Sequence, residues 1–200
     1  MLHRLSQTVA SIFLALGQSL KELSTWSEYV IDSFPVAVCR NIRINRCRLL
    51  KNKAYRGYNA SKREYFYGFK VEVITTADGL PVEYFIVAGS VHDAKAFEAM
   101  SVDLPEGSSL YADSAYTNYE LEDLYLECEQ VALLPQGKSN SHRKDSPALA
   151  FVKQTMRKSV ETAFSGIENA SPRLPPKNSL VPVRIHDRQV LINRNLSYLD

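Results

Sequence analysis

Residues 65–75, YFYGFKVEVIT, decide the fold of the central part of this 200-residue chain. Aromatic and β-branched residues dominate the stretch, and such residues favour β-strands. Asp78-Gly79 follows as a turn signal, and residues 82–87 return with the same strand chemistry. The pattern therefore predicts an antiparallel hairpin, around which the other elements can be placed.

Weaker signals on both sides of the hairpin predict the remaining elements. Residues 5–23 show the pattern of an amphipathic helix, and a first strand ends near Asp32, after which Pro35 limits regular pairing. The later elements are a helix from about Asp93, capped by His92-Asp93, a strand ending at Asp113, and segments 119–129 (helix), 131–134 (strand) and 148–168 (helix). This order predicts an α/β fold, a mixed sheet with helices packed on its faces.

Composition limits the class of protein. At 45% apolar residues, the chain can support one domain with a real core, plus arms or tails. Cys39, Cys47 and Cys128 have no paired metal-ligand spacing, and the histidines are scattered, which fits a reduced cytoplasmic compartment and argues against zinc. The apolar run at residues 12–16 is too short to span a membrane.

The net charge of +2 predicts no partner, but the distribution of charge does. Residues 40–70 hold ten basic side chains against the single acid Glu64. Such a segment can neutralise DNA phosphates, although a solvated basic loop is the alternative. Aromatic residues 65–69 are interpreted as an ordinary strand that feeds the core. The predicted DNA-binding residues are Arg40, Arg43, Arg46, Arg48, Lys51, Lys53 and Arg56, and a second, more ambiguous cluster of Lys138, Arg143, Lys144 and Lys158.

Three acidic residues stand in settings that suit a metal site. Asp32 and Asp113 each follow an apolar strand, and Glu161 lies within a helical pattern beside Val160 and Phe164. Taken singly, each is more often a turn, cap or solvent-facing residue. Strand ends in open α/β sheets collect functional residues, however, and three neighbouring carboxylates need cations to offset their repulsion. Together they predict a site for paired divalent ions that performs phosphoryl transfer.

Several segments of the chain resemble the DDE transposases of bacterial insertion sequences. They are residues 31–36 (IDSFPV), 55–58 (YRGY), 67–70 (YGFK), 111–116 (YADSAY) and 160–162 (VET). The resemblance implies a ribonuclease H-like core in which Asp32, Asp113 and Glu161 bind two magnesium or manganese ions. It also implies that water cleaves DNA at the element's end and that the freed 3′-hydroxyl attacks target DNA. The expected partners are element ends and target DNA, bound by a homodimer.

The match to the family's signature on the last catalytic helix is partial. Arg157 falls one helical turn before Glu161, as that signature requires. The signature's Tyr position holds Gln154, and its Lys position holds Glu168.

The expected organisation has three parts: an N-terminal amphipathic helix within residues 1–28, a catalytic core over 29–168, and a proline-containing tail over 169–200. The short first part and the polar tail indicate an incomplete transposase. Two alternatives to an active transposase stay open. One is a catalytically incomplete, DNA-binding remnant, and the other is a ribonuclease H-like nuclease that hydrolyses DNA without strand transfer.

Overall fold

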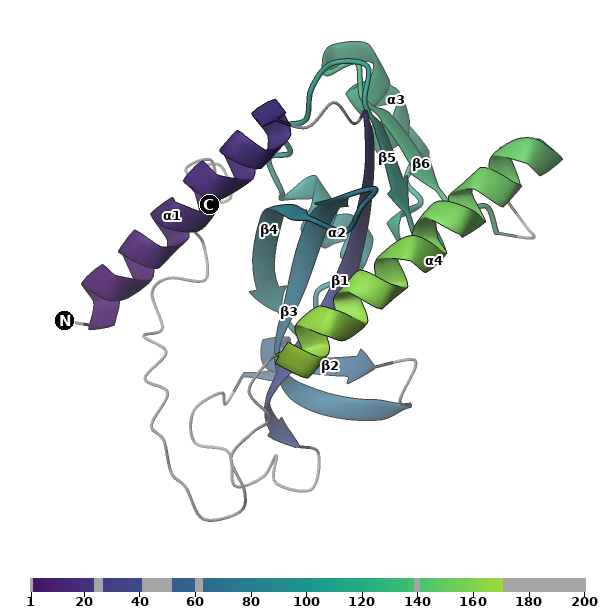
Figure 1. Ribbon diagram of the computed structural model, residues 1–200. Helices are drawn as coiled ribbons and strands as arrows, with labels where there is room; N and C mark the ends of the chain where they lie inside the picture. Colours follow the sequence, from purple (N-terminus) through teal and green to yellow (C-terminus); the bar gives the residue numbers. More distant parts are fainter. Residues whose placement is uncertain (1, 24–26, 41–51, 60–62, 139–140, 171–200) are drawn as a thin grey trace. The chain divides into compact units, whose positions relative to one another are not determined.

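The computed structural model describes residues 2–23, 27–40, 52–59, 63–138 and 141–170 (Figure 1). Within these ranges six strands form one mixed sheet in the order β2-β3-β1-β5-β6, with β4 paired to β3. The strands are β1 (Glu28–Arg40), β2 (Arg56–Asn59), β3 (Glu64–Thr76), β4 (Pro81–Ala88), β5 (Ser109–Ala112) and β6 (Ala132–Pro135). The helices are α1 (Leu2–Leu23), α2 (Asp93–Glu98), α3 (Tyr119–Cys128) and α4 (Pro147–Ala170), with single 3-10 turns η2 (Lys53–Tyr55) and η3 (Ser114–Tyr116).

Most predicted elements are confirmed. The hairpin is formed by β3 and β4, and Gly79 in its turn has a φ of 82°, which glycine adopts without strain. The long last helix begins with Pro147, whose missing N–H is not needed in the first turn. None of the helices in the described ranges is long and apolar enough to cross a membrane.

Strand β1 is longer than predicted, because it continues through Pro35 to Arg40. The prediction was wrong because the pairing of β1 with β5 ends at Ile31, so the backbone beyond it no longer has to donate hydrogen bonds to that neighbour. Gly68 on β3 also helps. A Cβ atom there would collide with the carbonyl oxygen of Val36, so only glycine permits this close approach of the two backbones.

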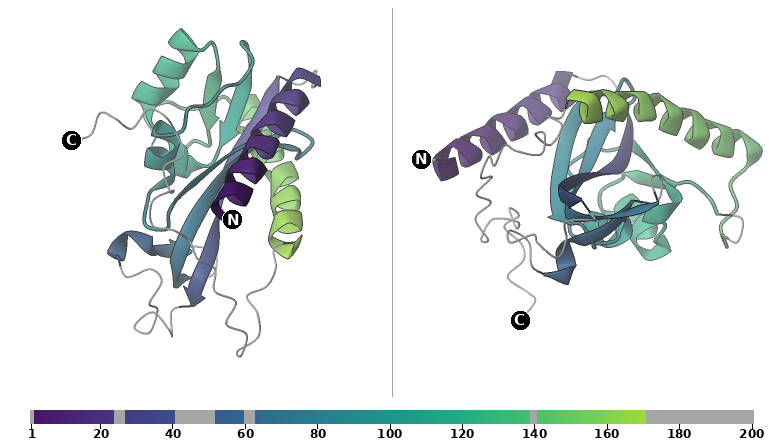
Figure 2. Two further views of the ribbon diagram at one scale, coloured as in Figure 1. Left: turned by 90° about the vertical axis from the view of Figure 1, so that its left-hand side faces the viewer. Right: turned by 90° about the horizontal axis from the view of Figure 1, so that it is seen from below.

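The chain divides into two compact units, and β1, β3 and β4 contribute residues to both. The first unit comprises Met1–Asp32, Val73–Tyr84 and Val102–Phe164. In it α1 and α4 lie on one side of the strands and α3 lies on the other (Figure 2). Its buried core includes Tyr29, Val30, Ile31, Ile74, Leu110, Tyr111, Tyr116, Val131 and Leu133.

The second unit comprises Ser33–Glu72, Phe85–Ser101 and Ser165–Asp200. Its described core is largely aromatic. Tyr67 and Phe69 of β3 form a buried cluster against which Val38 and Tyr55 pack. Phe97 of α2 is fully buried in the same unit.

Helix α1 contacts β4 through residues spaced four apart. Phe13 meets Tyr84 edge-to-face with ring centroids 6.0 Å apart. Gly17 passes so close to Val82 that a Cβ atom would collide with its carbonyl oxygen. The buried Lys21 Nζ lies 2.8 Å from Glu83 Oε1 and donates a hydrogen bond of 2.5 Å to the carbonyl oxygen of Asp103. Burial raises the pKa of Glu83, and the Lys21 ammonium opposes this.

The apolar side of α1 predicted from sequence differs from the side that packs. Ile12 and Leu16 belong to the apolar side of the amphipathic pattern in residues 5–23, yet 59% and 52% of their surfaces are exposed. Contact through a glycine and a buried lysine gives no apolar periodicity, which explains the error. In α3, likewise, Leu121 is buried, whereas the apolar Leu124 and Cys128 of the same helix are exposed.

Replacing Gly17 with Val should lower the free energy of unfolding by about 1–3 kcal/mol, the usual cost of forcing volume into a packed contact. Helix propensity alone favours the opposite sign, because Gly is a poor helix former. The matched control is Ser19→Val at an exposed position of α1, expected to change stability by less than about 0.5 kcal/mol. Urea denaturation of both variants checks this. A Gly17→Val protein as stable as the control would show that α1 is not held against β4.

Candidate active site

Asp32 and Asp113 occupy equivalent positions on neighbouring parallel strands. The last residue pair of the β1–β5 ladder is Ile31 with Ala112. The next residue along each chain is the aspartate. Asp32 remains in β1, while Asp113 directly follows β5 and caps η3. The structure therefore brings two of the three predicted acids to the carboxyl end of one strand pair.

The Asp113 carboxylate is held by donors from two elements. It accepts a hydrogen bond of 2.5 Å from the Ser114 backbone N–H and one of 3.2 Å from Arg157 Nη1 of α4. Both bonds fall on the same oxygen, Oδ1. Arg157 Nη1 also donates to Gln136 Oε1 at 3.0 Å, and Gln136 follows β6 directly. Arg157 thus joins α4 to the ends of two strands.

One turn earlier, α4 is fixed to β6 by a buried lysine. Lys153 Nζ donates to the carbonyl oxygen of Pro135 at 2.9 Å and lies 2.6 Å from Asp145 Oδ1. Only 7% of the Lys153 side chain and 18% of the Asp145 side chain are exposed, so both charges depend on this pairing. No pattern in the sequence predicts this contact, because an isolated lysine on a helix is usually solvated.

Helix α4 crosses the strand ends one strand per turn. Lys153 contacts the end of β6, and Arg157, four residues later, contacts Asp113 at the end of β5. Four helical residues rise about 6 Å, close to the spacing of about 4.8 Å between strands. Glu161 lies one further turn along the same side of α4. Its side chain is outside the part of the chain that the structure describes.

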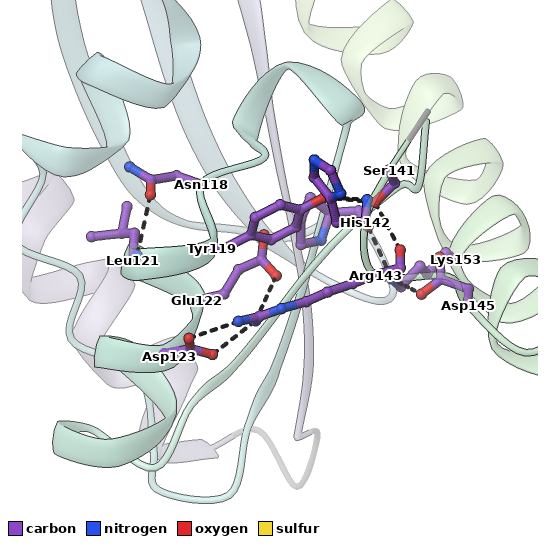
Figure 3. Close-up of polar contacts among 11 residues, drawn as sticks. Asn118, Tyr119, Leu121, Glu122, Asp123, Ser141, His142, Arg143, Asp145 and Lys153 are labelled. Atoms are coloured by element: carbon purple, nitrogen blue, oxygen red, sulfur yellow. Dashed lines mark hydrogen bonds and ion pairs between the residues drawn. The ribbon is translucent and has the colours of Figure 1, made fainter. Parts of the chain in front are cut away.

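The loop between β6 and α4 is tied to α3 by a polar network (Figure 3). The Tyr119 hydroxyl lies 2.7 Å from Ser141 Oγ and accepts a bond from the His142 backbone N–H. The Ser141 contact lowers the pKa of Tyr119. Arg143 lies over the Tyr119 ring, 4.8 Å from its centroid, and makes two hydrogen bonds of 2.8 and 2.7 Å to Asp123. This network fixes the loop from which α4 begins.

The charges in this network shift one another's titration. Hydrogen bonding from Arg143 lowers the pKa of Asp123, and the same bond raises the pKa of Arg143. Burial raises the pKa of Glu122, which lies 3.6 Å from Arg143, and the guanidinium opposes that shift. Arg143, predicted to bind DNA, is therefore engaged within the protein, which is a competing role for its charge.

A further cluster of polar residues, to which no sequence pattern assigned a role, lies in the second unit. Asp93 Oδ1 accepts hydrogen bonds from Ser33 Oγ at 3.0 Å and from Lys70 Nζ at 2.7 Å. Lys70 also donates to the Val91 carbonyl oxygen at 2.8 Å. His92 occupies the cap position of α2 but makes no side-chain cap bond, whereas the Asp93 carboxylate ties α2 to β3 and to the residue after Asp32. Ser33 and Lys70 lie in residues 31–36 and 67–70, two of the segments that resemble DDE transposases. That resemblance was the one feature of the sequence that could have indicated this cluster.

The predicted DNA-binding residues are only partly described. Arg43, Arg46, Arg48 and Lys51 lie outside the described residues, as does the side chain of Arg40 at the end of β1. Exposed side chains in the described part are those of Lys53, Arg56, Lys138, Arg143, Lys144 and Lys158. Their contact with DNA stays a prediction.

The donor set at the strand ends suits a hard divalent cation. Asp32 and Asp113 supply carboxylate oxygens at neighbouring positions, which magnesium and manganese prefer. Among the side chains that the structure describes, no group of three or more His, Cys, Asp or Glu is placed to hold a metal ion. The description does not reach the Glu161 side chain, so the predicted triad is not tested by that finding.

Comparison with known proteins identifies the family. A family model described as Transposase DDE domain matches residues 24–172, a span that contains all three acids, Arg157 and every described element except α1. No curated protein and no solved structure matches the chain. The mixed sheet with helices on its faces agrees with the ribonuclease H-like fold expected of such domains. The chain belongs to the family of transposases with a DDE domain.

Proposed function

We propose that this chain catalyses the DNA cleavage and strand transfer that move an insertion sequence. One observation carries the proposal: Asp32 and Asp113 each directly follow the last residue pair of the β1–β5 ladder, Ile31 with Ala112, and Arg157 of α4 contacts Asp113 there. An aspartate that only stabilises the fold does not need a second aspartate on the neighbouring strand and an arginine from a helix beside it. The cytoplasmic location and the homodimer on DNA are part of the same proposal.

The direction of α4 supports Glu161 as the third acid of the site. The helix meets β6 at Lys153 and β5 at Arg157, and β1 is the next strand in the sheet. One more turn carries Glu161 towards β1, the strand of Asp32. Glu161 would then complete a site with Asp32 and Asp113.

DDE transposases typically use divalent metal ions. Asp32, Asp113 and Glu161 would hold two magnesium or manganese ions, which supply a Lewis acid for the phosphodiester and lower the pKa of a bound water. The chain's own contribution is orientation. Ser114 and Arg157 both donate to Oδ1 of Asp113, so Oδ2 is the oxygen that would ligate an ion. Holding the carboxylate in one rotamer reduces the ordering needed when a metal binds.

Replacing Asp113 with Asn should abolish both DNA cleavage and strand joining, because a neutral amide is a poor ligand for a hard cation. The measurement is gel analysis of magnesium-dependent nicking and joining on a duplex carrying the inverted repeats beside the gene. Asp78→Asn in the exposed β3–β4 turn is the matched control and should leave both products unchanged.

Each other outcome of that assay points elsewhere. Nicking by the wild-type chain without a joined product would favour a nuclease. DNA binding with neither product would favour a catalytically incomplete remnant. Full activity of Asp113→Asn would refute the site.

The buried ion pair that fastens α4 should be worth much more than an exposed charge. Lys153→Met leaves the Asp145 carboxylate unpaired and should lower the free energy of unfolding by about 3 kcal/mol. The double variant Lys153→Met/Asp145→Leu should be closer to the wild type, because neither charge is then buried alone. Lys158→Met, an exposed lysine of the same helix, is the control. Equal urea midpoints for Lys153→Met and Lys158→Met would contradict this account.

Neutralising Arg43, Arg46 and Arg48 together should weaken binding to all DNA sequences, because phosphate contacts carry no sequence information. The slope of log affinity against log salt should become shallower by up to about 3, since each phosphate contact contributes about 0.9. Fluorescence anisotropy at several salt concentrations measures this slope. The control is Lys95→Ala, at an exposed position of α2. An unchanged slope would show that this segment does not contact phosphates.

A further inference from the structure

The exposed face of the β2–β3 pair carries an aromatic and basic cluster in which Arg56 is a predicted DNA-binding residue and the two tyrosines have no role in the proposed function. We propose that Arg56, Tyr58 and Tyr65, here named the aromatic platform, bind unpaired nucleobases of single-stranded DNA by stacking. The inference rests on the proposed function in taking DNA as the substrate. It adds a site for bases that have left the double helix.

Strand register places the platform residues together. β2 and β3 pair antiparallel, with Tyr58 directly opposite Tyr65 and Arg56 opposite Tyr67. Directly opposed residues share one face of a sheet, so Arg56, Tyr58 and Tyr65 lie on the same face. The rings of Tyr58 and Tyr65 have centroids 5.0 Å apart and are tilted by 55°. The Arg56 guanidinium carbon lies 4.4 Å from the Tyr65 centroid, within cation–π range.

The two rings are exposed where the rest of the strand is buried. Tyr58 keeps 53% and Tyr65 44% of its surface exposed, whereas Phe66, Tyr67 and Phe69 are buried. The sequence interpretation of residues 65–69 as an ordinary strand is confirmed, and Phe66, Tyr67 and Phe69 are its core residues while Tyr65 is exposed. Next to the platform, Tyr67 and Phe69 pack with Val38 and Tyr55, so the exposed rings rest beside a rigid core.

The charge around the platform selects an anionic occupant. Lys53, Arg56 and Arg63 are exposed in the basic segment at residues 40–70, and Glu64 is the single acid of that segment. A second copy of this face would bring like charges together, which disfavours a self-association surface. Single-stranded DNA offers phosphates to the basic groups and flat base faces to the tyrosines, and stacking tolerates any base. In duplex DNA the base faces are already stacked, so the platform discriminates for unpaired nucleotides.

The first test needs no substitution. Binding of the full chain to a twelve-nucleotide oligodeoxythymidine is compared with binding to an abasic sugar-phosphate strand of the same length and to a duplex, all in EDTA. Stacking should make the base-containing strand bind about tenfold more tightly than the abasic strand at equal charge. Equal affinities for the two strands would overturn the proposal.

Substitutions then assign the preference to the platform. Tyr58→Leu/Tyr65→Leu keeps apolar bulk on the hairpin but cannot stack, and it should remove the preference while leaving affinity for the abasic strand unchanged. Tyr58→Phe/Tyr65→Phe retains both ring faces and should behave as the wild type. If the Leu variant unfolds more easily yet keeps the full preference, the tyrosines serve only the hairpin and the proposal fails.

The result is independent of catalysis, because EDTA removes any metal-dependent chemistry. A chain that prefers bases but yields no cleavage would retain the platform and lose the proposed catalytic function. A chain that cleaves and joins DNA without any preference for bases would have the proposed catalytic function and would contradict the proposed role of the aromatic platform.

Discussion

The register of β1 against β5 is the constraint on which the candidate site depends. Parallel pairing aligns Ile31 with Ala112, and each acid is the next residue. Because side chains alternate between the two faces of a strand, a slip by one residue would turn one carboxylate away from the other. The fully buried Tyr29 and Leu110, and Ile31 at 1% exposure, define that register through packing. The apolar core thus positions two charged groups that contribute nothing to it.

Helix α4 adds the second dimension of the site. A strand places side chains along its own length, whereas a helix that crosses the strand ends places side chains next to several strands in turn. Among its described contacts, the hydrogen bonds of Lys153 and Arg157 are directional, whereas apolar packing would permit sliding. The loop before α4 is fixed to α3 through Arg143 and Tyr119. The orientation of α4 is therefore determined at its start and again over Asp113.

Sequence reasoning succeeded where periodicity and turn chemistry operate and failed where contacts are specific. Strand and helix types, the hairpin and the positions of Asp32 and Asp113 directly after apolar strand residues were predictable. The continuation of β1 through Pro35 was not, because it depends on where β5 stops pairing. Neither Lys21 nor Lys153 could be recognised as buried, since the partner acids lie on other elements.

The long separation between β1 and its parallel partner affects how the chain folds during synthesis. β1 leaves the ribosome early, but the strand that aligns with it follows about eighty residues later. Translation at about 5–20 residues per second leaves an interval of several seconds in which the apolar edge of β1 has no parallel neighbour. An unpaired edge of this kind invites aggregation. The β3–β4 hairpin is completed within that interval, so early pairing of β1 with β3 would protect the nascent strand before β5 has been synthesised.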